Sequence, residues 1–321
     1  MTRFAALRTR AGLLSGYGAA ALAVLIWASY PVATRAGVTG SFEPQDLMFL
    51  RFGVGALLFL PYVALQFHAI RRDAWLQGVP LSVFQGAGMA ALVICGLQFA
   101  PANHAAALGP GIAPAWIALF GFLVFSRRPS TRMVVGAALC MIGVITLGSW
   151  SVSAPSSTIL AGDAMFVAAS ALGSLYVLQL RNWGIGAIQG AAIVTLYSAL
   201  LVVPWHLWST SGALWQVAPF ELLWQVLWQG VLIGCIALVA LNHAIARLGA
   251  ERSGALVALV PALSAALGHF FLGEIPSTAE IIAILAISAG VSIGASCGYG
   301  GSPAASSAPA KRAACALSRP G

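Results

Sequence analysis

Long apolar stretches separated by short polar segments run along almost the whole chain. A helix needs about 20 consecutive apolar residues to cross the hydrocarbon core of a membrane. Scanning the sequence with a window of that length predicts ten membrane-spanning helices. They are placed at residues 13–32, 47–67, 77–98, 105–125, 133–150, 160–180, 188–208, 222–246, 254–272 and 280–297. The pattern therefore predicts an all-α polytopic membrane protein.

The second half of the chain repeats features of the first half at a constant separation of 147 residues. Pro114 and Pro129 are matched at this separation by Pro261 and Pro276. At the same separation, Ser130 is matched by Ser277, and the dipeptide Gly143-Val144 is matched by Gly290-Val291. Self-similarity of this kind is typical of transporters built from two halves. Because each half holds five expected spans, an odd number, the sequence predicts two inverted five-helix repeats.

These repeats divide the chain into four parts. Residues 1–12 are expected to form a cytoplasmic N-terminal segment, residues 13–150 the first repeat and residues 160–298 the second. Residues 299–321 are rich in Ser, Ala, Pro and Gly, and we expect a disordered cytoplasmic tail there.

The positions of the charged residues predict how the chain is oriented in the membrane. Only 7% of residues are charged, whereas soluble domains carry about 25%. With the N-terminus inside, 14 of the 16 basic residues fall on the inner side, and only Arg35 and Arg51 fall on the outer side. Basic residues in short loops stay on the cytoplasmic side. The sequence therefore predicts an inner-membrane protein with both termini in the cytoplasm, and the net charge of +8 reflects topology rather than a nucleic-acid partner.

The sequence offers no motif for a cofactor, a metal or an enzyme active site. The five cysteines lack metal-ligand spacing, and paired aspartates or a His-Glu zinc pair are missing. We therefore expect neither catalysis nor a cofactor. The expected partners are membrane lipid and a small-molecule solute. A second copy of the chain is a further candidate partner, because small residues at helical spacing serve internal packing and dimer contacts alike.

Several motifs together resemble those of the EamA-type transporters of the drug/metabolite transporter superfamily. They are Trp27-Ala28-Ser29-Tyr30-Pro31, Leu50-Arg51-Phe52, Gly162-Asp163, and Gly273-Glu274-Ile275-Pro276-Ser277, with Pro114 and Pro261 in the fourth helix of each repeat. The first repeat departs from the family at Arg127, where an acidic residue is usual. The resemblance implies a ten-helix inner-membrane carrier, usually an exporter of amino acids, other metabolites or toxic compounds.

Polar and aromatic side chains inside the expected spans are the candidates for a solute-binding cavity, because polarity is costly in hydrocarbon. The alternative for Trp27, Tyr30 and the face that carries both Gln225 and Gln229 is an aromatic belt at the membrane surface. Arg35 and Arg51 flank the loop that contains Glu43 and Asp46, and they are expected either to attract anionic groups or, as we favour, to pair with these two acids. The cavity candidates are Trp27, Tyr30, Gln85, Ser174, Gln225 and Gln229.

Coupling and motion have four further candidates. Histidine titrates near neutrality, so His104 and His243 are candidates for proton coupling, with a facilitator driven by the solute gradient as the alternative. Pro114 and Pro261 interrupt two expected helices and are candidate hinges, with static kinks as the alternative.

The sequence thus predicts a transporter that moves a small metabolite, amino acid or drug-like solute by alternating access, in the export direction. The alternatives are an accessory or receptor subunit and a membrane-embedded enzyme.

Overall fold

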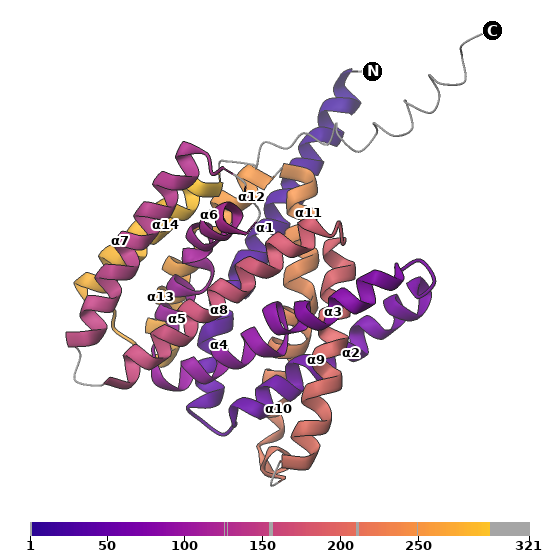
Figure 1. The fold of residues 1–321 in the computed structure, drawn as a ribbon, viewed down its shortest axis with the longest axis vertical. Coiled ribbons are helices and arrows are strands. Elements are labelled where there is room, and N and C mark those ends of the chain that lie inside the picture. The colour runs from indigo at the N-terminus through magenta and orange to yellow at the C-terminus, as the bar shows by residue number, and fades with distance from the viewer. Residues whose placement is uncertain are drawn as a thin grey trace.

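The computed structural model describes residues 2–124, 126, 128–153, 157–209, 212–248 and 250–295, and Figure 1 shows how their helices are arranged. These residues are almost entirely helical and contain no strand. The all-α prediction is therefore confirmed for them. Arg127 and the tail at 299–321 lie outside the described residues.

In the first half of the chain, two of the five expected spans are interrupted helices. The third span is divided at Gly86, and the fourth at Gly109. The elements are α1 (Thr2–Val38), α2 (Pro44–Gln66), α3 (Arg72–Gln85), α4 (Ala87–Phe99), α5 (Ala102–Leu108), the 3-10 helix η1 (Pro110–Ile112), α6 (Ala113–Leu123) and α7 (Thr131–Ser153).

The second half shows interruptions in the same two spans. The elements are α8 (Ser157–Asn182), α9 (Ala187–Ser209), the 3-10 helix η2 (Ala213–Gln216), α10 (Pro219–Gln225), the π-helix η3 (Val226–Ile236), α11 (Ala237–Leu248), α12 (Ala250–Val257), α13 (Val260–Leu272) and α14 (Thr278–Ala295). Its third span therefore contains a π-helical segment, and its fourth is divided between α12 and α13.

Within the described residues, eight helical stretches have the length and hydropathy of a membrane span. Two shorter apolar helices, Thr131–Leu147 and Thr278–Gly294, accompany them. The eight stretches are Leu13–Val38, Pro44–Gln66, Arg72–Phe99, Ala102–Leu123, Thr158–Leu180, Ile188–Ser209, Pro219–Leu241 and Ala255–Leu272.

Pro114 and Pro261 each lie at the second position of a helix that follows a break. Proline is favoured in the first turn, because the backbone donor that it lacks has no partner within the helix there. The two prolines therefore begin α6 and α13 rather than bending the interior of a continuous helix. Their role as hinges stays a prediction.

The break at Gly86 is stabilised from a neighbouring helix. The Oγ of Ser198 on α9 accepts a hydrogen bond of 3.0 Å from the backbone N–H of Ala87. A Cβ atom at Gly86 would lie only 2.0 Å from that Oγ. The close approach of α9 to the α3–α4 junction therefore requires glycine at this position.

We expect Gly86→Ala to destabilise the protein by about 1–3 kcal/mol, because the added methyl group must displace Ser198. The midpoint of thermal unfolding in detergent would measure the loss. Gly18→Ala is the matched control, because a Cβ at this helical glycine meets no atom within 4 Å. Equal midpoints for the two variants would contradict the expectation.

The two halves pack through contacts that occur in equivalent pairs. The first helix of each half contacts the fourth span of the other, as α1 does with α13 and α8 with α6. The second helix of each half contacts the third span of the other, as α2 does with η3 and α9 with α3. The fifth helices, α7 and α14, lie side by side (Figure 1). The halves therefore interlock across a shared interface.

Candidate functional site

The two ends of the helix bundle differ in charge. We call one the acidic end, because it carries Glu43, Asp46, Asp163, Glu221, Glu274 and Glu280. The opposite end, the basic end, carries Arg71, Arg72, Arg128, Arg132, Arg247 and Arg252. In Figure 1, α10 lies at the acidic end, at the bottom of the view, and α12 lies at the basic end, at the top.

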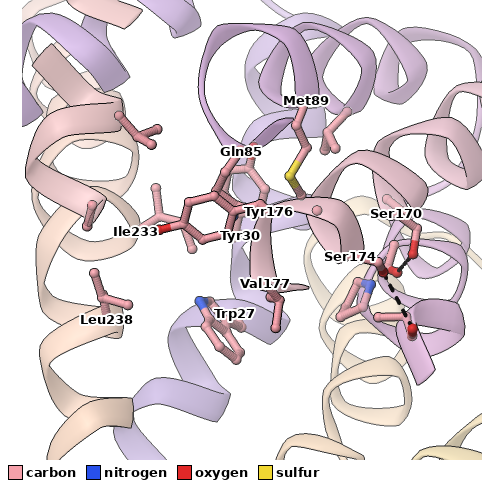
Figure 2. A pocket seen from close by; sticks show the side chains of 18 of the residues that line it. Trp27, Tyr30, Gln85, Met89, Ser170, Ser174, Tyr176, Val177, Ile233 and Leu238 are labelled. Atoms are coloured by element: carbon pink, nitrogen blue, oxygen red, sulfur yellow. Dashed lines mark hydrogen bonds between the residues drawn. The ribbon is translucent and has the colours of Figure 1, made fainter. Parts of the chain in front are cut away.

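A cavity of about 450 Å³ lies between the two halves of the chain. Trp27 and Tyr30 on α1 point into it, between Ile233 and Leu238 on one side and the α8 serines on the other (Figure 2). Apolar and aromatic side chains form most of its wall, as is usual for sites that bind small molecules. The structure brings four of the six predicted cavity residues together here, namely Trp27, Tyr30, Gln85 and Ser174.

Among the described residues that line the cavity, Arg51 is the one charged side chain. Its Nη1 donates a hydrogen bond of 2.7 Å to the hydroxyl of Tyr30, and its guanidinium carbon lies 5.2 Å from the centre of the Tyr30 ring. The hydroxyl accepts this bond, so its own hydrogen stays available for a second acceptor. The expectation that Arg51 pairs with Glu43 or Asp46 is therefore wrong, because Tyr30 supplies the contact.

Hydroxyl groups face the cavity at the interrupted fourth span. The Oγ of Ser170 donates to the carbonyl of Gly109 at 2.5 Å, and the Oγ of Ser174 donates to the carbonyl of Ala113 at 3.4 Å. Both carbonyls lie beside the break, where the regular helical bonds are interrupted. Ser170 and Ser174 therefore bind α8 to both sides of the break, and their hydroxyl oxygens can still accept a bond.

Contacts between polar and charged side chains join the two halves at the acidic end. Arg35 on α1 forms an ion pair with Glu274, and its Nη1 donates to the carbonyls of Leu97 and Ala100. His206 on α9 lies 2.7 Å from Asp46 on α2. Arg35 thus pairs across the halves with Glu274 rather than with Glu43 or Asp46, contrary to expectation.

The profile of the EamA-like transporter family matches residues 14–149 and again residues 160–294. The chain belongs to the EamA-like transporter family. It is 30% identical over 271 residues to threonine/homoserine exporters RhtA of Salmonella typhimurium (strain SL1344) and Escherichia coli (strain K12). In each case the match spans 80% of this chain and 81% of the relative. The family resemblance expected from the motifs is confirmed.

The fold of this EamA-like chain is also found in a crystal structure that is described only as that of a protein. The TM-score is 0.58 at 22% identity, and the alignment covers 89% of this chain and 97% of the other. Together with the eight apolar stretches, membership of the family makes the chain an integral membrane protein and a membrane transporter.

Two predicted cavity residues of this EamA-like transporter, Gln225 and Gln229, lie elsewhere. Neither lines the cavity, and both are buried. The Nε2 of Gln225 donates to the carbonyl of Ala33 at 2.8 Å, and that of Gln229 donates to the hydroxyl of Thr34 at 2.9 Å. Amides inside a membrane bundle need such partners, so these two residues bind the α10–η3 segment to α1 instead of facing a solute.

The two predicted coupling residues of the EamA-like chain also have different surroundings. His243 on α11 is exposed, and its Nε2 lies 3.4 Å from the Oγ of Ser15. His104 on α5 is completely buried, with a carboxylate at each ring nitrogen. The sequence pointed to His104, and Asp163 stood out in the Gly162-Asp163 motif, but nothing indicated that these two residues meet each other or Glu280. Glu280 carried one signal, since Ser277 and Glu280 have the spacing of a helix capping box.

Proposed function

We propose that this EamA-like transporter exports a small solute that carries a carboxylate, of the amino-acid class, across the inner membrane. The observation that carries the proposal is Arg51, the one charged side chain among the described residues in the cavity wall. An arginine binds carboxylates through charge-assisted hydrogen bonds. The Tyr30 hydroxyl, held by Arg51, provides a further donor for the same group.

The remaining cavity wall fits a solute with a short, partly polar side chain. Trp27, Met89 and Ile233 offer apolar contact, and Gln85 and Ser174 offer hydrogen bonds. A volume of about 450 Å³ lies within the range of sites for small molecules. The RhtA relatives are named as exporters of threonine and homoserine, which both carry a carboxylate and a hydroxyl group. Their names support the amino-acid class and the direction of export.

Alternating access follows in this proposal from two inverted repeats of five spans each. The helix α7 has 23 residues and α14 has 18, and both numbers fall within the range of about 17–25 residues that membrane-spanning helices contain. With these two helices the spans number ten, and the second repeat enters from the opposite side. The equivalent contacts between the halves support this arrangement. Inverted repeats commonly rock against each other around a central site.

The proposal includes the orientation of the chain in the membrane. The basic end faces the cytoplasm, because arginines in short loops resist translocation, and the acidic end faces outward. Contacts across the halves, Arg35 with Glu274 and Asp46 with His206, join the acidic end in this structure. We therefore assign the structure to the state in which the outer side is closed. A homodimer in the membrane stays a prediction.

Counterflow in proteoliposomes tests the function. Vesicles containing the purified chain are loaded with unlabelled threonine or homoserine, and uptake of the same labelled amino acid is followed against empty vesicles. We expect the labelled amino acid to be taken up. The corresponding labelled amides, which lack the carboxylate, should not be taken up. Equal uptake of acids and amides would contradict the assigned solute class, and no flux of any tested compound would contradict the proposed function.

A further inference from the structure

A second group of buried polar residues lies at the acidic end, apart from the cavity, and joins the two halves. His104 on α5 belongs to the first half, whereas Asp163 on α8 and Glu280 on α14 belong to the second. The Nδ1 of His104 lies 2.8 Å from Asp163 Oδ1, and its Nε2 lies 2.9 Å from Glu280 Oε1. The three side chains are 0%, 7% and 3% exposed, so we call them the buried His cluster.

The geometry of the buried His cluster fixes the number of protons that it holds. An ionised carboxylate only accepts hydrogen bonds, and a neutral imidazole has one donor and one acceptor nitrogen. A neutral ring between two ionised carboxylates can therefore form only one of the two bonds. The second bond requires one additional proton. This holds whether the extra proton is on His104, Asp163 or Glu280. The contacts of the cluster thus depend on a bound proton.

Other contacts favour the ionised form of Glu280. Its Oε2 accepts a hydrogen bond of 2.7 Å from the backbone N–H of Ser277, and its Oε1 accepts one of 3.1 Å from the amide of Asn103. Glu280 also lies in the first turn of α14, where the positive end of the helix dipole stabilises an anion. These contacts make the imidazole ring the natural place for the extra proton.

The surrounding charges leave the cluster negative. Arg35 on α1 is paired with Glu274, whose Oε2 accepts a bond of 3.1 Å from the N–H of Ala102 on α5. On α13, His269 is exposed and contacts the backbone carbonyl of Glu274, and α4 carries no charged side chain. With an imidazolium the cluster carries a charge of −1, and without the extra proton −2. Among the described residues, no group of side chains is arranged to hold a metal ion.

We propose that His104, Asp163 and Glu280 form a proton-binding site that holds the acidic end closed, and that loss of the proton opens it. The proposal rests on the alternating-access function proposed above. When the proton leaves, a carboxylate oxygen faces the lone pair of an imidazole nitrogen, with little water to solvate either group. Burying an unpaired charge is costly, and separation of the halves relieves that cost by admitting water. Acid on the outer side therefore stabilises the outward-closed state.

The contact between His206 and Asp46 provides a matched control, because it lies at the same end and also joins the two halves. The Nε2 of His206 is 2.7 Å from Asp46, whereas its Nδ1 has no hydrogen-bond partner among the described residues. A neutral imidazole satisfies one such bond without an extra proton. Closure through His206 is therefore expected to be independent of proton binding.

The distance between two spin labels tests the proposal directly. The labels are placed at Ser41 in the first half and Ile275 in the second, both exposed at the acidic end, in the full chain with its five cysteines replaced by alanine. Distances are measured by electron–electron double resonance in lipid nanodiscs without solute, from about pH 5.5 to about pH 9. We expect the ratio of long to short distances to rise with pH, approaching tenfold per pH unit for one linked proton.

Variants assign the response to the cluster. His104→Gln cannot carry the extra proton, so we expect its distances to be independent of pH, whereas His206→Gln should keep the response of the parent. Distances that do not change with pH in a labelled protein that transports solute would overturn the proposal, as would an unaltered response in His104→Gln. Because no solute is present, a pH response in a protein that shows no counterflow would support the proton site and contradict the transport function instead.

Discussion

We expect Arg51→Gln to weaken binding of a carboxylate solute by about 10- to 150-fold, since a hydrogen bond to a charged group contributes about 1.5–3 kcal/mol. Arg51 is the one charge among the described cavity-lining residues, so no neighbouring cation there replaces it. The glutamine keeps an amide donor at this position and removes the charge. Binding to the purified protein, followed by isothermal titration calorimetry, measures the change.

Comparing how the Arg51→Gln variant binds an amino acid and its amide distinguishes loss of the charge from loss of the fold. The parent is expected to prefer an amino acid over its amide, whereas Arg51→Gln should bind both about equally. Arg51→Lys retains the charge but lacks the planar guanidinium that can donate two parallel hydrogen bonds. Its preference for the acid over the amide should lie between those of the parent and Arg51→Gln. Arg128→Gln, which removes an exposed arginine at the basic end, is the control for net charge. An undiminished preference for the acid in Arg51→Gln would show that another group binds the carboxylate.

The sequence allowed the course of the chain to be predicted well, because apolar length and proline spacing are local signals. The offset of 147 residues seen in the prolines reappears in the structure, where α6 and α13 begin at Ala113 and Val260, and α7 and α14 at Thr131 and Thr278. The breaks at Gly86 and in the π-helix were not predicted. The break at Gly86 depends on the bond from Ala87 to Ser198, which is 111 residues beyond Ala87 in the chain.

The site was harder to predict, because hydropathy does not show which face of a helix meets a cavity and which meets another helix. Trp27 and Gln229 were both cavity candidates, yet Trp27 lines the cavity and Gln229 bonds to α1. The partners of His104 are 59 and 176 residues away in sequence. Only the packing of α5 against α8 and α14 brings these ionisable groups together, so no local pattern could have indicated the buried His cluster.

Packing between α7 and α14 leads to the second large effect, since these helices approach each other through glycines. A Cβ atom at Gly290 would lie 2.6 Å from Cys140 Sγ and 2.6 Å from the carbonyl oxygen of Gly136. We expect Gly290→Leu to cost about 3 kcal/mol or more, because the backbone of α7 must move away. Gly18→Leu is the control, since Gly18 is exposed and a Cβ there meets no atom within 4 Å. Thermal unfolding and the yield of monodisperse protein measure the difference.

The counterpart of Gly290 extends this prediction to the symmetry of the fold. Gly143 lies 147 residues earlier, and a Cβ atom there would be 2.5 Å from Ile287 and 2.8 Å from the carbonyl oxygen of Ala283. The contact of Gly143 with Ala283 repeats that of Gly290 with Gly136 after the halves are exchanged. Equivalent contacts should have similar energies, so we expect Gly143→Leu to lower the unfolding midpoint about as much as Gly290→Leu does. A large loss at one glycine and none at the other would show that the two halves do not share this interface symmetrically.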